Sequence, residues 1–473
     1  MEIKSTAGIV KWFEYIEQNY PVASWRIGDV LYWPIIRNDL YLKLSNAVLA
    51  ATSGKNYKAK KSNPLVNLWY SNKRLLEAVS APSRFLKNTQ EANTLTFSAF
   101  SHRTLFNGQF WNRYVDALYD NDKLGNNYIF EYHTITDSVF NQYYKKERVI
   151  ALYKAYPLFN TKAKWIKLFQ FSSIDHELVG YDKFLGEIRK QPLIAKQVKR
   201  YEVKSLLDRH RNFLVMARFY KKLLEKAQPK KVFLLCYYTT NLYPLIHVAN
   251  QLGIDTIDIQ HGGQGAEHLA YTNWLQWPDD KKYSCLPKLF WVWDEVAKWN
   301  IQNNFEAQQI HYHTAFVGGN PWIDFLKTVD ISSVNLPENI ILYSLQPYGK
   351  LLEDEIVTAI KNCPPHFHWY LRLHPRQLHQ KQVLLDFLKV NGIHHLVNIE
   401  DATSMQLPIL LRKAKLHITR SSGAAVEASL MGVKNLIMDE AGKEMYSKEI
   451  ESNELYVYIE QVILDLNKFI YGE

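Results

Sequence analysis

Residues 230–263, KKVFLLCYYTTNLYPLIHVANQLGIDTIDIQHGG, decide the fold that the sequence predicts. KKVFLLCYY (230–238) is a short apolar run typical of a buried parallel strand. TTNLYPLIHVANQLG (239–253) has the spacing of a helix and ends at a glycine. IDTIDIQHGG (254–263) reads as a second strand, so the segment predicts one βαβ unit.

The same alternation continues downstream. KLFWVWDEVAKWN (288–300) and HTAFVGGNPWIDFL (313–326) each predict a strand followed by a helix, and a second alternating series runs from 339 to 440. Such a pattern favours open parallel sheets with helices on both faces. We therefore expect an α/β chain with two Rossmann-like, doubly wound domains facing a cleft. Upstream of 230 we expect aromatic helices and loops, with 130–215 largely helical.

The predicted boundaries follow from these two series. The N-terminal domain, with its helical and aromatic elaboration, is expected at 1–325, and a nucleotide-binding domain at 326–445. We expect 446–473 to form a C-terminal helix that packs back on the N-terminal domain.

Composition excludes several classes of protein. The 473 residues include only three cysteines, far apart in the chain, which argues against a disulfide framework and a cysteine-rich zinc site. The chain has no GxxxxGK[ST], GxGxxG, HExxH or GxSxG pattern, which disfavours P-loop ATPases, dehydrogenases, zinc proteases and α/β-hydrolases. We expect no metal and no cofactor.

The charge balance points to anionic partners. With 57 Lys and Arg against 47 Asp and Glu, the net charge is +10, which suits nucleic acid, phosphorylated small molecules or an acidic membrane surface. We find no secretory signal and no apolar run long enough to span a membrane, so we expect a cytoplasmic protein, free or resting on the inner face of the membrane. A nucleic-acid-binding protein is the alternative from another class, suggested by the charge and by NYKAKKSN (56–63).

Two predicted strand ends in the second series carry groups that bind phosphate. In open α/β sheets, ligands bind beyond the carboxyl ends of the strands. Arg420, Ser421, Ser422 and Gly423 join a strand to a helix that contains Glu427, and such a helix start favours anions, unless the serines only cap the helix. In RLHPR (372–376), Arg372 and His374 share one face of a strand and Pro375 ends it, with Arg376 beyond.

Two more strand ends lie in the first series. QHGGQG (260–265) places Gln260 and His261 at a glycine turn, where His261 suits general acid–base catalysis, unless it is only a hydrogen-bonded turn residue. Asp258 lies on the strand before it, and Glu267 lies on the loop that follows. VGGNP (317–321), with Gly318, Gly319 and Asn320, is either a further binding turn or a plain connection between domains.

Three of these motifs, in this order, give the chain a resemblance to bacterial surface-polysaccharide glycosyltransferases of the GT-B fold. They are Gln260-His261-Gly262, His374-Pro375, and Ser421-Ser422 before a helix containing Glu427. The same trio resembles capsule and lipopolysaccharide transferases that use CMP-activated Kdo or other nonulosonic acids. It also resembles CDP-glycerol glycerophosphotransferases. The resemblance covers roughly 230–445.

The resemblance implies the function and the site. It implies transfer of a sugar, with CMP-linked Kdo or another nonulosonic acid favoured as donor, to a growing capsule or O-antigen glycan that is lipid-linked or an oligosaccharide. CDP-glycerol or ribitol phosphotransfer, or a UDP- or GDP-sugar donor, is the alternative. The catalytic candidates are His261, Asp258 and Glu267. The donor-binding candidates are Arg372, His374, Pro375, Arg376, Arg420, Ser421, Ser422, Gly423, Glu427, Gly318, Gly319, Asn320 and Gln260.

Two departures from these families stand out. The acidic pair followed by Gly, which supplies the acid–base residue in bacterial sialyltransferases, is missing. Arg420 stands where glycerophosphotransferases carry an acidic residue.

Overall fold

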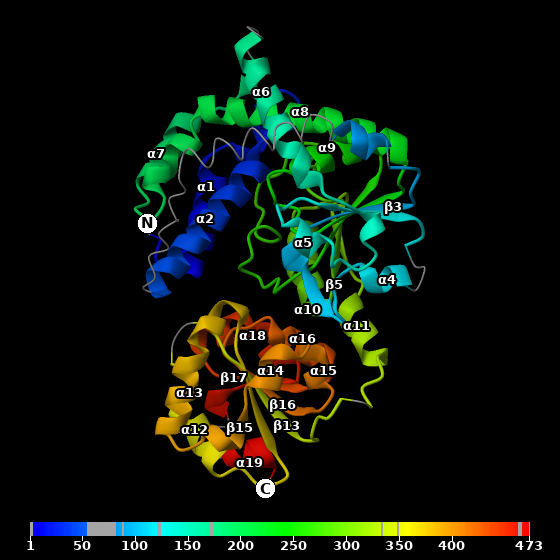
Figure 1. Cartoon of the computed structure of the whole chain (residues 1–473). Coiled ribbons are helices and arrows are strands. Elements are labelled where there is room, and N and C mark those ends of the chain that lie inside the picture. Colours follow the sequence, from blue (N-terminus) through cyan, green and yellow to red (C-terminus); the bar gives the residue numbers. More distant parts are fainter. Residues whose placement is uncertain are drawn as a thin grey trace, which may run out of the picture. The chain divides into compact units, whose positions relative to one another are not determined.

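The computed structural model describes residues 3–53, 82–87, 89–120, 124–169, 174–332, 334–347, 350–461 and 466–472 (Figure 1). The basic stretch NYKAKKSN (56–63) lies outside these ranges. The chain divides into two compact units, Met1–Gly319 and Asn320–Glu473. Helix α11 (Pro321–Thr328) therefore belongs to the second unit, where Arg412 donates hydrogen bonds to the carbonyls of Leu326 and Val329.

A parallel seven-stranded sheet forms the centre of the first unit, in the order β12-β11-β10-β9-β3-β6-β7. The chain builds outward from β3, first to β6 and β7 on one side and then to β9 and its successors on the other. The direction of winding thus changes between β3 and β9. The strands are β3 (Thr94–Ser98), β6 (Asn127–Glu131), β7 (Val149–Ile150), β9 (Lys231–Leu234), β10 (Asp255–Ile259), β11 (Leu289–Val292) and β12 (Thr314–Val317).

Helices and two small antiparallel sheets complete the first unit. The small sheets comprise β1 (Arg26–Ile27), β2 (Val30–Leu31) and β8 (His176–Glu177), and the hairpin β4 (Arg103–Phe106) with β5 (Gln109–Asn112). The helices of this unit include α1 (Thr6–Asn19), α2 (Trp33–Ser53), α4 (Asp116–Asp120), α5 (Asp137–Phe140), α6 (Tyr156–Phe169), α7 (Tyr181–Arg189), α8 (Val203–Ala227), α9 (Tyr243–Gln251) and α10 (Glu295–Ala307). The expectation of helices and loops before 230 is therefore incomplete, because β3, β6 and β7 come from this region.

The second unit repeats the design with a parallel six-stranded sheet, in the order β15-β14-β13-β16-β17-β18. Its winding changes direction between β13 and β16. The strands are β13 (Ile340–Ser344), β14 (His368–Arg372), β15 (Val397–Asn398), β16 (Ala414–Thr419), β17 (Lys434–Ile437) and β18 (Tyr456–Tyr458). The helices are α12 (Asp354–Lys361), α13 (Lys381–Val390), α14 (Glu400–Ser404), α15 (Leu407–Leu411), α16 (Ala424–Leu430), α17 (Glu440–Met445), α18 (Ser447–Ser452) and α19 (Leu466–Tyr471). The predicted α/β class, with two doubly wound, Rossmann-like domains and a helical N-terminal elaboration, is confirmed.

The C-terminal segment differs from the expected single helix on the N-terminal domain. Residues 446–473 instead contribute β18 to the second sheet, and α19 packs into the core of the same unit. The Trp369 indole donates a 3.1 Å hydrogen bond to the Tyr471 hydroxyl, which in turn donates to the carbonyl of Ala359. Tyr456, Tyr458, Ile470 and Tyr471 are all buried, so this segment completes the second core.

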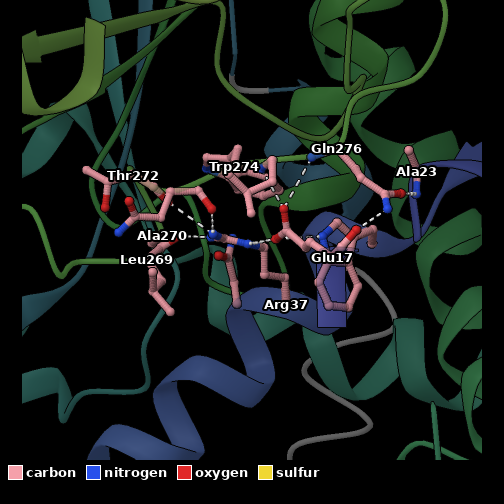
Figure 2. Close-up of polar contacts among 12 residues, drawn as sticks. Glu17, Ala23, Arg37, Leu269, Ala270, Thr272, Trp274 and Gln276 are labelled. Carbon is pink, nitrogen blue, oxygen red and sulfur yellow. Dashed lines mark hydrogen bonds and ion pairs between the residues drawn. The ribbon is translucent and has the colours of Figure 1, made fainter. Parts of the chain in front are cut away.

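A buried ion pair ties the N-terminal helices to the loop that follows β10 (Figure 2). Arg37 on α2 and Glu17 on α1 are both fully buried, and Arg37 Nε lies 2.7 Å from Glu17 Oε1. Arg37 also donates to the carbonyls of Leu269, Thr272 and Asn273, and its guanidinium lies 4.0 Å from the centre of the Trp274 ring.

The carboxylate of Glu17 also accepts several hydrogen bonds. Glu17 Oε2 accepts the backbone N–H of Leu275 at 2.6 Å, and Glu17 Oε1 accepts the Trp33 indole N–H at 3.1 Å. Burying two charges is costly in itself, but here nearly every polar atom has a partner. The pair therefore acts as a clamp that sets the path of residues 269–276.

Replacing Glu17 should leave Arg37 buried without its counter-charge. We expect Glu17→Ala to lower the free energy of unfolding by about 3–5 kcal/mol, the usual cost of breaking a buried pair from one side. Denaturant titration followed by tryptophan fluorescence measures it. Glu14→Ala, on the same helix α1, is the control and should change stability by less than about 0.5 kcal/mol. Equal losses in the two variants would contradict the clamp.

Candidate functional site

In the first unit, polar side chains gather where the winding of the sheet changes direction. Ser98 ends β3, Cys236 and Tyr238 follow β9, and His261 follows β10. The Cys236 Sγ lies 2.9 Å from His261 Nε2, and the Tyr238 hydroxyl lies 3.2 Å from the same nitrogen. His102, just beyond β3, adds a ring nitrogen 3.7 Å from the Cys236 sulfur. Ligands of doubly wound sheets bind at such a switch point.

The hydrogen bonds assign the tautomers of the two histidines. The backbone N–H of Ala99 donates to His102 Nδ1 at 3.1 Å, so a neutral His102 carries its proton on Nε2 and donates to Cys236. The thiol proton of Cys236 is then free to point at His261 Nε2. His261 Nε2 is therefore an acceptor, with the ring proton on Nδ1, and Nε2 is the atom that could remove a proton from a substrate.

Burial keeps this cluster uncharged. It lowers the pKa of His261 to about 4 and that of His268 to about 3, and it raises the pKa of the Cys236 thiol to about 12. The pKa of His102 is also lowered, first by burial and then by the neighbouring His261. At neutral pH the histidines are therefore free bases, and Cys236 is a thiol rather than a nucleophilic thiolate.

Cys236 has an unusual backbone. Its φ of 62° lies in the left-handed region, which residues other than glycine rarely adopt. Backbone of this kind is concentrated at functional sites, where the surrounding structure holds it in place. In this chain it directs the thiol toward the two histidines.

The other residues predicted near His261 are Asp258, Gln260 and Glu267, and they lie in the structure around the cluster. Asp258 is buried and accepts hydrogen bonds from the Tyr237 N–H at 3.0 Å and the Tyr271 hydroxyl at 2.9 Å, and burial raises its pKa to about 8. Gln260 is also buried, and its amide bridges the Trp293 N–H and the Gly262 carbonyl. Glu267 is half-buried in the loop near Tyr41. His261 is thus the predicted catalytic residue with direct access to the cluster.

In the second unit, His374 presents a donor beyond β14. It precedes the 3₁₀ helix Pro375–Gln380, and its Nδ1 accepts the Arg376 backbone N–H at 3.1 Å. A neutral ring therefore carries its proton on Nε2. No hydrogen bond to this nitrogen occurs within the described ranges, so the N–H is available to a phosphate oxygen. Half-burial lowers the pKa of His374, with Arg376 contributing.

The two predicted strand-end arginines are both engaged within the unit. Arg372 Nη1 donates to the carbonyls of Ala402 at 2.6 Å and Met405 at 2.7 Å, and burial lowers its pKa while Glu427 opposes the shift. Arg420 is buried, with its Nη2 2.8 Å from Glu353. The negative charge of Glu353 therefore balances much of the positive charge of Arg420 at this strand end. The structure brings Arg372 and Glu427 into electrostatic reach of each other.

The serine turn follows β16, next to the winding switch of the second sheet. The Ser422 hydroxyl accepts the Ala424 N–H at 3.3 Å, and the Ser422 carbonyl accepts the Tyr446 hydroxyl at 2.5 Å. Ser421, Ser422 and Gly423 are all partly exposed. Gly442 on α17 packs directly against the Arg420 carbonyl, where a Cβ would clash. The turn is held from two sides while its hydroxyls stay accessible.

The remaining predicted residues have visible structural roles. Gly318 packs on the Trp291 ring, which excludes a side chain there, and the Trp291 indole donates to the Gly319 carbonyl at 2.8 Å. Asn320 caps α11 by accepting the N–H of Trp322 at 3.1 Å. These contacts fit the plain connection between domains better than a binding turn. Pro375 and Arg376 are exposed at the start of the 3₁₀ helix.

Two structural findings bear on metals and membranes. Within the ranges that the structure describes, no group of three His, Cys, Asp or Glu side chains could hold a metal ion. In the same ranges, no helix combines the length and the apolarity needed to cross a bilayer.

The sequence did not single out His102, Cys236 or Tyr238 as functional. Cys236 and Tyr238 sit in the apolar run KKVFLLCYY, where they read as strand residues, and His102 lies in a region without a predicted strand. Only the strand order identifies them as candidates. It makes β3 and β9 neighbours at the winding switch, and each of these residues follows one of those two strands.

Comparisons with known proteins give distant structural neighbours only. No protein-family model and no curated protein matches the sequence. UDP-GlcNAc 2-epimerase from Methanocaldococcus jannaschii, solved with UDP-GlcNAc and UDP, is 16% identical, with a TM-score of 0.41 over 80% of this chain and 93% of that one. A putative UDP-N-acetylglucosamine 2-epimerase from Listeria monocytogenes is 13% identical, with a TM-score of 0.43 over 81% and 89%. The glycotransferase of kitacinnamycin is 11% identical, with a TM-score of 0.41 over 78% and 86%.

These likenesses are too distant to assign an activity. The architecture stands instead on the two parallel sheets themselves, and the candidate site on the residues at their winding switches.

The lowered pKa of His261 should appear as a pH dependence of stability. An unfolded His takes up a proton below pH 6.5, but the folded His261 does so only near pH 4, so acid favours unfolding. Between pH 7.5 and 5.5 this residue should remove about 1.4 kcal/mol from the free energy of unfolding. In His261→Gln this contribution should vanish, so the free energy of unfolding should fall less steeply as the pH is lowered.

Denaturant titrations of both proteins across this pH range measure the difference. NMR titration of the His261 ring provides an independent check, since the ring should stay neutral at pH 5.5. A midpoint near 6.5, or identical pH profiles, would contradict a desolvated His261.

Proposed function

We propose that this chain is a glycosyltransferase that moves a sugar from a nucleotide-activated donor to a hydroxyl of a growing surface glycan such as capsule or O-antigen. One observation carries the proposal. In both sheets, the side chains able to bind phosphate or to move a proton follow the strands at the winding switch or the strand next to them, in the region where doubly wound folds bind ligands.

The second unit supplies the donor side of the reaction. Its hydrogen-bond donors include the His374 Nε2–H and the hydroxyls of Ser421 and Ser422, which are partly exposed residues. Arg372 adds positive charge beneath them. Such groups stabilise a phosphate that gains negative charge as it leaves, which lowers the barrier to transfer. Glu427, on the helix after the serine turn, is suited to accept hydrogen bonds from ribose hydroxyls.

The first unit supplies the base. His261 Nε2 is a neutral acceptor at pH 7, so it can take the proton of an acceptor hydroxyl as that oxygen attacks the anomeric carbon. The carbon–oxygen bond to the acceptor forms while the bond to the nucleotide phosphate breaks, and the nucleotide leaves with the electron pair. Because Cys236 and Tyr238 already contact Nε2, a substrate hydroxyl must replace one of them.

Among donors, we favour CMP-linked Kdo or another nonulosonic acid. The support is the His374-Pro375 pair followed by the serine pair, the combination on which the family resemblance rests. CDP-glycerol or CDP-ribitol phosphotransfer is the alternative within the same resemblance. Glycerophosphotransferases carry an acidic residue where this chain has Arg420. Because Arg420 is paired with Glu353, an acidic group nevertheless lies beside the serine turn, which supports this alternative.

Nucleotide binding separates these donors. We expect CMP, at about a hundred times its Kd, to stabilise the protein by about 2.7 kcal/mol in a panel with CDP, UDP and GDP, measured by thermal or chemical unfolding. A response led by CDP would favour glycerol- or ribitol-phosphate transfer, and one led by UDP or GDP a conventional sugar donor.

His374→Ala should weaken the stabilising nucleotide by at least tenfold, because a hydrogen bond to a charged phosphate is lost. His379→Ala is the matched control, since His379 is an exposed histidine of the same 3₁₀ helix, and it should bind as the wild type does. Unchanged binding in His374→Ala would remove His374 from the donor site. If no nucleotide bound with or without a glycan acceptor present, the proposed function would fall.

A further inference from the structure

The positive charge of the chain is concentrated on two helices. Helices α6 and α8 together carry ten Lys and Arg against two Asp and Glu, whereas the whole chain has a net charge of +10. Neither the proposed base nor the proposed donor site uses any of these residues. The concentration therefore calls for an explanation of its own.

Part of this charge surrounds a hollow of about 450 Å³ between α6, α8 and residues 82–87. Lys162, Arg218 and Lys222 line it together with Trp165. All three cations are exposed, and none forms an ion pair or a hydrogen bond within the described part of the chain. By contrast, Lys167 and Arg211 nearby are both paired with Asp208.

The floor of the hollow is apolar, formed by Leu86, Phe159, Ile166, Val215 and Phe219. At its rim, Trp165 is 63% exposed, the most exposed aromatic side chain among the large hydrophobic residues of the described chain. A large exposed indole beside cations and above an apolar floor makes this surface amphipathic. It suits the boundary between lipid headgroups and acyl chains, where indole rings concentrate.

We propose that this face of α6 and α8, comprising Lys162, Trp165, Arg218 and Lys222, binds the surface of an anionic membrane. The three cations meet lipid phosphates, and Trp165 enters the interfacial layer above the apolar floor. Charge complementarity selects an anionic bilayer over a neutral one. The inference is independent of the proposed transfer reaction, because it uses different residues and needs no nucleotide.

Vesicle sedimentation of the full-length protein tests this surface. We expect binding to phosphatidylcholine vesicles that contain about 30% phosphatidylglycerol, little binding to pure phosphatidylcholine vesicles, and weaker binding as salt rises. The triple variant Lys162→Gln, Arg218→Gln, Lys222→Gln should bind the anionic vesicles about a hundredfold less tightly, at about fivefold for each basic residue near the surface.

A matched variant controls for total charge. Lys11→Gln, Lys183→Gln, Arg189→Gln removes the same charge from exposed sites on α1 and α7 and should change vesicle affinity by less than about threefold. Circular dichroism should show that both variants are folded. Brominated acyl chains should quench part of the tryptophan fluorescence of the wild type, and Trp165→Phe should remove that part.

Three outcomes would overturn the proposal. The first is equal binding of the wild type to anionic and neutral vesicles, and the second is equal loss in the two triple variants. The third is binding of a short single-stranded oligonucleotide, lost in the first triple variant, without vesicle binding, which would assign the surface to nucleic acid. Nucleotide stabilisation measured on the same variants keeps the two proposals separate, since failure of one leaves the other standing.

Discussion

The buried pair of Glu17 and Arg37 is the constraint on which the first candidate site depends. It joins two helices near the N-terminus to the loop after β10, more than two hundred residues later in the chain. That loop carries Tyr271, whose hydroxyl holds Asp258, and Asp258 in turn fixes the Tyr237 backbone beside Cys236. The position of the thiol next to His261 therefore rests on a series of buried contacts that begins at the ion pair of Glu17 and Arg37.

In the second unit, a buried histidine links the strands at the winding switch. Beneath the switch between β13 and β16, His417 bonds through one ring nitrogen to Ser344 at 2.9 Å and through the other to Asn435 at 2.7 Å. Burial lowers the pKa of His417 to about 4, so this histidine is a neutral link between three neighbouring strands. It fixes the strand ends from which the serine turn departs. His374 and His417 thus have different tasks, and burial distinguishes them: the half-buried ring keeps an available N–H, and the fully buried ring has none.

The second series of strands was predictable because its signals are local. Apolar runs such as NIILYS and LHIT, closed by Ser, Gly or Pro, matched β13 and β16, and the residues after them fell at the strand ends as expected. The strands β3, β6 and β7 were not predicted because long, irregular segments separate them from one another and from β9, so no regular alternation of strand and helix marks them. For the same reason the sequence could not show that β3 is the centre of the first sheet. His102 and Cys236 become neighbours only through that strand order, and the clamp formed by Glu17 and Arg37 likewise pairs residues whose burial no local pattern reveals.

Charge is distributed unevenly over three regions of this basic chain: the cluster around His261, the strand ends of the second unit, and helices α6 and α8. The cluster around His261 is uncharged at neutral pH, which suits proton removal from a hydroxyl and disfavours the binding of an anion. The strand ends of the second unit carry neutral donors beside arginines whose charge is already partly balanced by carbonyls or by Glu353. Cations without an ion pair in the described part of the chain line the hollow between α6 and α8 instead. The net charge of +10 is therefore a poor guide to the chemistry of the candidate site, because the charge that sequence counting detects and the groups that would perform the reaction belong to different surfaces.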